Sequence, residues 1–213
     1  MGAVVLVWAL TGCSGSDEDP AADPSSGDDS SAVPSQDAAT EAPYLPVPDG
    51  VELTAQGSEL EVGDTATVAW EPRKKVVGAL AIKVTRLERA SIRALSAFRL
   101  EPAQKRATPY YVRTTVRNVG DTDLAGVSIP LYAVDGQDRL IQATPFAATF
   151  KPCPSAPLPK PFKTGAKVDA CLVYLVPDPG RLEAVSFRPT QEYDPITWTG
   201  PIETPRRPQQ QPG

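Results

Sequence analysis

Residues 110–120, with the sequence YYVRTTVRNVG, constrain the fold of this chain more than any other stretch. Alternate positions there separate into two sets: Tyr110, Val112, Thr114 and Val116 on one side, and Tyr111, Arg113, Thr115 and Arg117 on the other. A period of two in β-branched and aromatic residues predicts a strand with one buried and one exposed face. Asn118 and Gly120 tolerate the positive φ of a tight turn, so the strand is expected to end there. We therefore expect a central strand of a β-sandwich.

Similar alternation recurs along the rest of the chain. It is found at residues 66–70, 80–84, 127–133, 139–143, 171–175 and 182–187. The dipeptide Asp135-Gly136 lies between two apolar runs and predicts a β-hairpin. About seven or eight short strands with at most one helix predict an all-β protein, a sandwich of two sheets.

The period changes between residues 85 and 100. Apolar residues recur there at spacings of three and four, at Leu87, Ala90, Ala94 and Phe98. Arg86, Arg89 and Arg93 form an adjacent stripe. This pattern predicts an amphipathic helix that crosses between strands, while Ile92 and Leu95 widen its apolar side and keep a strand open as the alternative.

Residues 14–49 contain nine acidic residues and no Lys or Arg. Few of the other residues in this segment could form a core, so we expect a disordered spacer. An acidic interaction tail is the alternative. Without those nine, 17 of the 26 acidic residues remain against all 21 basic ones, so residues 50–213 carry a net charge of +4 although the whole chain carries −5.

Residues 1–13 resemble a lipoprotein signal peptide. Residues 3–10 form an apolar run of eight, which is too short to span a bilayer. The run leads into Leu10-Thr11-Gly12-Cys13, which resembles the bacterial lipobox. That resemblance implies that Cys13 receives a diacylglyceryl group and becomes the mature N-terminus, which anchors the protein to the outer face of the cell membrane. A short buried helix with an ordinary cysteine is the alternative.

The two remaining cysteines are expected to pair. Export places Cys153 and Cys171 in an oxidising compartment, and lipidation of Cys13 leaves neither of them another partner. Two free buried thiols are the alternative. The pair is separated by 18 positions with no Trp between, so the sandwich is expected to be Ig-like in architecture without the sequence pattern of an antibody domain.

Three stretches together resemble a family of uncharacterised Ig-like domains: VGDTATV, then YYVRTTVRNVG, then the paired cysteines before LVYLVPDPGRLEAVSF. These domains occur in secreted proteins and lipoproteins of high-GC Gram-positive bacteria, and a small secreted mycobacterial antigen has a related fold. The resemblance covers roughly residues 59–198. It implies an exported accessory or binding domain and supplies no binding residues.

The expected organisation follows from these observations. Residues 1–12 are a signal peptide, 13–50 are the lipidated cysteine and linker, 51–200 are the Ig-like β-sandwich, and 201–213 are a disordered tail.

The composition argues against most enzyme chemistry. Histidine is absent, so the usual general base, the commonest metal ligand and any His-containing triad are missing. The aspartates at 121 and 123, or at 135 and 138, lack the spacing of a Ca²⁺ loop. We expect no cofactor, no metal and no nucleic-acid partner. A carboxylate pair for glycoside hydrolysis depends on spatial separation, which the sequence leaves open.

Two functional classes remain. The first is a non-catalytic binding module tethered to the cell surface, and the second is an extracytoplasmic hydrolase of cell-envelope glycan that works without histidine. For the first, a binding surface is predicted from the exposed side of the central strand and the preceding segment, with residues Tyr111, Arg113, Arg117, Arg86, Arg89 and Arg93. Arginine and tyrosine suit an anionic cell-envelope polymer or an acidic protein surface. Solvated arginines, or arginines paired with Glu88 and Glu101, are the alternative.

Overall fold

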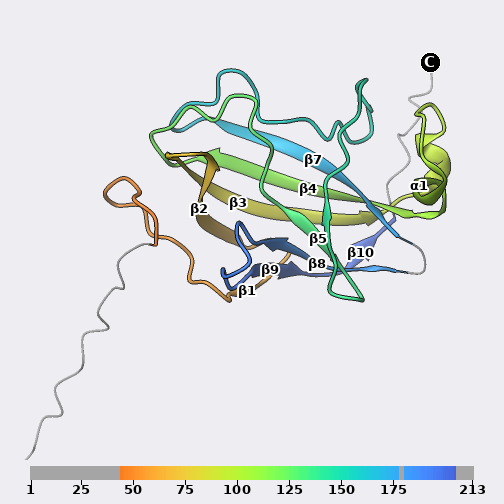
Figure 1. Cartoon of the computed structure of the whole chain (residues 1–213), viewed down its shortest axis with the longest axis horizontal. Coiled ribbons are helices and arrows are strands. Elements are labelled where there is room, and N and C mark those ends of the chain that lie inside the picture. The colour runs from red at the N-terminus through yellow and green to blue at the C-terminus, as the bar shows by residue number, and fades with distance from the viewer. Residues whose placement is uncertain (1–43, 178–179, 205–213) are drawn as a thin grey trace, which may run out of the picture. The chain divides into compact units, whose positions relative to one another are not determined.

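The computed structural model describes residues 44–177 and 180–204. These residues form two β-sheets packed face to face, so the predicted β-sandwich is confirmed (Figure 1). One sheet has the strand order β1-β9-β8-β5-β6, and the other has the order β10-β3-β4-β7 with β2 also paired to β3. Among the described residues no helix is long and apolar enough to cross a membrane.

The elements follow one another along the chain as ten strands, one short 3-10 helix and one short α-helix in the described part. They are β1 (Glu59–Glu61), β2 (Thr65–Arg73), β3 (Val76–Arg89), the 3-10 helix η1 (Ile92–Leu95), α1 (Pro102–Arg106), β4 (Thr108–Asn118), β5 (Tyr132–Asp135), β6 (Leu140–Gln142), β7 (Lys167–Val176), β8 (Leu182–Phe187), β9 (Ile196–Thr199) and β10 (Ile202–Glu203). The count exceeds the predicted seven or eight because β1, β6 and β10 have only two or three residues each.

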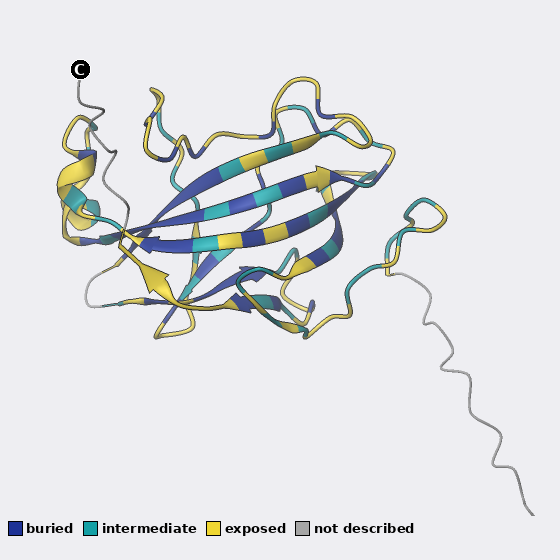
Figure 2. Ribbon diagram, turned by 180° about the vertical axis from the view of Figure 1, so that it is seen from behind, coloured by how far each residue is buried: buried dark blue, intermediate teal, exposed yellow. Residues whose placement is uncertain are grey.

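Strand β4 is the central strand that the sequence predicts. It pairs antiparallel with β3 on one side and with β7 on the other. Tyr110, Val112 and Val116 point into the core between the sheets, where they meet Phe187 and Trp198 of the opposite sheet in one apolar cluster. Figure 2 shows the resulting alternation of buried and exposed bands along the strands of this sheet.

The chain changes sheets twice at one corner of the sandwich. Gly63, between β1 and β2, has a φ of 115° and so needs a residue without a side chain. Gly200, between β9 and β10, lies so close to Val62 that a Cβ there would meet the valine side chain at 2.7 Å. The Val62 N–H donates to the Thr199 carbonyl at 2.8 Å, which holds the two crossings together.

The predicted helix between residues 85 and 100 is wrong for most of its length. Strand β3 continues to Arg89, and only the single 3-10 turn η1 follows. The register of β3 against β4 shifts between Val84 and Arg86, so Thr85 is an inserted bulge residue. Val84 and Leu87 therefore both face the core, so Leu87, the first residue of the helix-like pattern, belongs to the strand.

The ends of the described chain also pack against the sandwich. The Tyr44 hydroxyl donates to the Ala69 carbonyl at 2.8 Å, and the Tyr44 ring lies 5.2 Å from that of Tyr193. Packing of this chain on β2 therefore begins before residue 51. At the other end, Ile202 and Glu203 form β10 instead of a disordered tail, because they pair in parallel with Leu87 and Glu88.

Asn118 has a different role from the one predicted. The described residues with a positive φ include neither Asn118 nor Gly120. Asn118 is instead the last residue of β4 and is fully buried. Its side-chain amide donates to the carbonyls of Thr122 and Phe162, both at 2.8 Å, and its oxygen accepts from the Gly120 N–H at 3.0 Å. The side chain therefore holds two loops at the end of the central strand.

Replacing this amide should destabilise the sandwich. Asn118→Ala removes three hydrogen bonds from a buried site; the Gly120 N–H and the Phe162 carbonyl keep their bonds to Ala79 and Leu124, but the Thr122 carbonyl loses its partner. We therefore expect the free energy of unfolding to fall by about 2 kcal/mol. Urea denaturation of the chain from residue 14 measures it. The exposed neighbour Arg117→Ala is the control and should change the value by about 0.5 kcal/mol or less. Equal effects of the two substitutions would contradict this role of Asn118.

Candidate binding surface

The outer face of the sheet that contains β4 brings together cationic side chains from three strands. The register places Lys167 of β7 directly opposite Arg117 of β4. It places Lys83 of β3 opposite Thr115, one cross-strand row away on the same face. All three cationic residues are exposed. We call Lys83, Arg117 and Lys167 the basic face.

The basic face carries a net positive charge, because its three cations lie beside a single carboxylate, that of Asp169. Within the described chain, none of its three residues is in an ion pair. The carboxylate in the neighbouring position, Asp169, accepts a hydrogen bond from the Thr115 hydroxyl at 2.6 Å. Side chains directly opposite each other in an antiparallel pair lie about 5 Å apart, and like charges there are destabilising. An anion bound between Arg117 and Lys167 would relieve this repulsion.

Sequence reasoning found only one of these three residues. Arg117 was predicted from the alternation of the central strand, whereas Lys83 and Lys167 were missed. Each lies at a polar position in a segment where apolar and polar residues alternate. This pattern would have indicated that both side chains are exposed. Their proximity to Arg117 depends on cross-strand register, which the local pattern does not give.

Arg86 and Arg113 are held by a buried carboxylate. Glu88, which is 2% exposed, accepts from Arg113 Nε at 3.1 Å and from Arg86 Nη1 at 3.3 Å. Arg86 Nε also lies 3.7 Å from a Glu203 carboxylate oxygen. The pairing with Glu88 that the sequence left as an alternative is therefore present, and these two arginines are largely neutralised.

Arg89 and Arg93 lie away from the basic face. Arg89 ends β3 opposite Tyr110, which is seven residues from Arg117 along β4, or about 23 Å. Arg93 lies in η1. Both are exposed. The structure therefore does not bring the six predicted residues into one surface.

Tyr111 is the clearest correction to the predicted surface. It points to the outer side of β4 as expected, but it is only 2% exposed. Its ring lies 5.8 Å from that of Phe150, in a second apolar cluster that covers this part of the sheet. Burial, with a smaller contribution from Glu88, raises the pKa of its hydroxyl. Tyr111 is a core residue and is not available to a partner.

The second cluster is fastened to the sheet by a disulfide. Cys153 and Cys171 are joined, with their Cα atoms 5.0 Å apart, as predicted. The bridge links the proline-rich segment before β7 to β7 itself. Phe150 is buried there, while Phe146 is partly buried against it. Together they close the half of the outer face that contains Tyr111.

The buried carboxylates do not form a hydrolytic pair. Glu88 lies in the sheet of β4, and Asp135 lies in the opposite sheet at the end of β5. Asp135 begins the predicted hairpin, which is confirmed, and pairs with Arg139 at 2.6 Å. Burial would raise the pKa of Asp135, but hydrogen bonds from Arg139 and from the backbone outweigh it and hold that pKa below its usual value.

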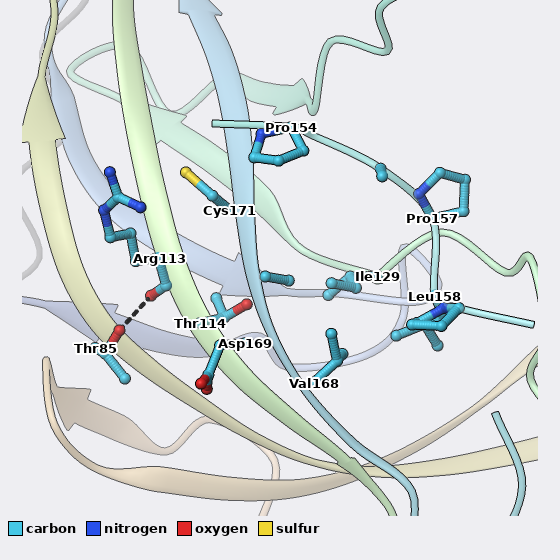
Figure 3. A pocket seen from close by; sticks show the side chains of 13 residues that line it. Thr85, Arg113, Thr114, Ile129, Pro154, Pro157, Leu158, Val168, Asp169 and Cys171 are labelled. Carbon is cyan, nitrogen blue, oxygen red and sulfur yellow. Dashed lines mark hydrogen bonds between the residues drawn. The ribbon is translucent and has the colours of Figure 1, made fainter. Parts of the chain in front are cut away.

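A cavity of about 340 Å³ lies beside β7, between that strand and the proline-rich segment. Figure 3 shows its apolar wall, with Ile129, Leu158 and Val168 close together. Pro154 and Pro157 also line it. Thr114, although buried, also lines it.

Two further predictions concern metal binding and the lipidation of Cys13. In the part of the chain that the structure describes, no three His, Cys, Asp or Glu side chains are grouped as metal ligands. Cys13, the predicted lipidation site, lies outside the described residues.

Comparison with known proteins gives one solved structure. No protein-family model and no curated protein sequence matches the chain. Among solved structures, the chain is similar to MPT63, a secreted protein from Mycobacterium tuberculosis whose crystal structure was determined at 1.5 Å resolution. The two are 15% identical, the match covers 69% of this chain and 100% of that chain, and the TM-score is 0.49.

The disulfide should make a large contribution to stability. Because it closes a loop of 18 positions, reduction should lower the free energy of unfolding by about 3 kcal/mol in the chain-entropy picture. Denaturation of the chain from residue 14, with and without reductant, measures this. Thiol titration of the denatured, unreduced protein is the control. Two reactive thiols per chain would contradict the bridge.

Proposed function

We propose that this protein is a non-catalytic binding module that works outside the cytoplasm, anchored to the outer face of the cell membrane through Cys13. Its β-sandwich binds an anionic partner on the basic face. A cell-envelope polymer that carries phosphate or carboxylate groups is the favoured partner, and an acidic protein surface offers the same chemistry.

The observation that carries this proposal is the net positive charge of the basic face. Arg86 and Arg113 share a buried carboxylate, whereas Lys83, Arg117 and Lys167 have no ion-pair partner among the described residues. The three lie on neighbouring strands of one exposed sheet face. Exposed cations on such a surface attract polyanions in a manner that salt screens.

Two features support a location outside the cytoplasm. Disulfides persist in oxidising compartments, and the Cys153–Cys171 bridge fastens an entire apolar cluster to the sheet. The lipobox-like sequence before Cys13 supplies the route of export and the anchor.

The geometry favours binding over hydrolysis of glycan. A glycosidase needs two carboxyl groups about 5–10 Å apart on either side of the scissile bond. Glu88 and Asp135, the buried carboxylates of the described chain, belong to opposite sheets, and each is paired with arginine. Neither is free to act as an acid or a nucleophile.

Charge reversal on the basic face should weaken polymer binding. We expect the double variant Arg117→Glu, Lys167→Glu to be retained about tenfold less on purified anionic cell-wall polymer, because it turns attraction into repulsion at two contacts. The matched control is Arg89→Glu, Arg93→Glu, which changes the net charge equally at exposed positions elsewhere. Retention is measured at low salt and at about 0.5 M salt, where the difference should largely disappear.

The same assay can contradict the proposal in two ways. Equal losses in the two double variants would mean that net charge alone, and not the basic face, governs retention. Wild-type protein that is not retained at low salt would exclude the polymer as the partner.

The anchor has its own test. Cys13→Ala should leave an uncleaved precursor without acyl chains, because the sulfur that accepts the diacylglyceryl group is missing. Metabolic labelling with a fatty acid, followed by membrane fractionation, measures this for wild type and variant. Cys153→Ala is the control and should keep the label. Wild-type protein that is unlabelled and fractionates with the cytosol would contradict the anchor.

A further inference from the structure

The outer edge of β7 is only half covered. Odd-numbered residues of β7 direct their backbone groups away from β4, as the contacts at Cys171 and Val173 show. The Ser155 N–H donates to the Cys171 carbonyl at 2.8 Å, and the Thr144 N–H donates to the Val173 carbonyl at 2.7 Å. The Val173 N–H donates to the Ser155 hydroxyl at 3.1 Å. The loops that carry Thr144 and Ser155 therefore satisfy the edge at the Cys171 carbonyl and at Val173.

The other half of the edge has no such cover. Lys167 and Asp169 occupy the same alternate positions, and no backbone hydrogen bond joins them on that side to another segment of residues 44–177 or 180–204. Unpaired N–H and C=O groups in a row are a template for another strand. The free stretch runs from Lys167 to the N–H of Cys171, where the disulfide-held loop begins to cover the strand.

The cavity of about 340 Å³ opens beside this free stretch. Val168, Asp169, Ala170 and Cys171 of β7 all contribute to its lining. Its opposite wall is apolar and comes from Pro157, Leu158 and Ile129, as Figure 3 shows. A strand added along the edge would therefore have a pocket for one apolar side chain.

One buried polar group in the cavity is also unsatisfied. The Thr114 residue is 1% exposed, its side chain lines the cavity, and its hydroxyl has no hydrogen-bond partner in the described part of the chain. Buried hydroxyl groups are usually hydrogen-bonded. A polar atom of the ligand, and not the apolar side chain that fills the cavity, would have to supply this partner.

We propose that the free edge of β7 binds an extended peptide segment of a partner protein as an added strand, with one apolar side chain in the cavity next to Thr114. A peptide is the only common polymer whose N–H and C=O groups alternate at the spacing of a strand edge. The loop beside the cavity carries Lys160 and Lys163 before Lys167 begins β7, so the peptide has acidic residues next to the apolar one.

A second copy of this chain fits this edge less well. In a symmetric antiparallel pair centred on Asp169, two carboxylates would lie directly opposite each other, which is unfavourable. A hydrogen-bonding polymer such as a glycan lacks the matching backbone. The site adjoins the basic face at Lys167 but does not depend on the proposed function.

The probe is a displayed library of random linear peptides about ten residues long, a length sufficient to pair with an edge strand. It is screened against the chain from residue 14 to residue 213, which contains every described residue. Peptides with an apolar residue beside acidic residues should be enriched, and a synthetic copy of the best one is used for affinity measurement. Failure to enrich any peptide above a resin control would overturn the proposal.

Asp169→Pro tests the backbone contact. Proline removes the N–H that faces the free edge, and it is tolerated at such positions because the ladder to β4 does not use that group. Asp169→Ala is the matched control, since it removes the carboxylate and keeps the N–H. The synthetic peptide should bind Asp169→Pro about tenfold more weakly than Asp169→Ala. Equal affinity for the two variants would overturn the proposal.

Hydrogen exchange of the wild-type protein tests the same contact even if the Asp169→Pro variant does not fold. Bound peptide should slow hydrogen exchange of the Asp169 and Cys171 amides in the wild-type protein. Unchanged exchange at both amides with saturating peptide would overturn the proposal, as would exchange that slows only when the protein dimerises in analytical ultracentrifugation. Arg89→Glu, at an exposed position far from this edge, should leave peptide affinity within about threefold, which shows that the net charge of the protein does not govern peptide binding.

Discussion

The pairing of β4 with both β3 and β7 is the interaction on which the rest of this structure depends. It satisfies the backbone of the central strand on two sides, so every second side chain can be committed to the core without loss of hydrogen bonds. The opposite sheet then packs on that inner face through residues such as Phe187 and Trp198. The same ladder fixes which side chains meet on the outer face, and this decides both the ion pairs and the exposed cations.

The outer face is divided into a covered half and an open half, and the disulfide defines the boundary. On the covered side, Tyr111 and Phe150 pack beneath a segment that Cys153 ties to β7. On the open side, Arg117 and Lys167 remain in solvent. The bridge adds a covalent link to the hydrogen bonds that Ser155 makes with β7. The bridge therefore stabilises the domain and also sets the limits of the surface that a partner can reach.

The burial of Glu88 determines which cations on this face are paired and which remain free. Glu88 is desolvated, and a buried carboxylate is stable only when cations and hydrogen bonds compensate it. Arg86 and Arg113 provide that compensation and are thereby removed from the pool of free cations. The cations that remain are those without a buried acid beside them. These cations lie on one open face, next to an unpaired strand edge. Both proposals above therefore concern this side of the sandwich.

The sequence by itself determined the fold class, the central strand, the hairpin at Asp135 and the pairing of the two cysteines, because periodicity, turn residues and cysteine count are local or compositional properties. It also located Arg117. Only the tertiary structure decided that Tyr111 is buried and that Lys167 lies opposite Arg117. It likewise decided that residues 85–89 continue a strand, because pairing with β4 extends past the bulge at Thr85 to Arg89. These features depend on register and on what covers a face, and both arise from contacts between segments far apart in the chain.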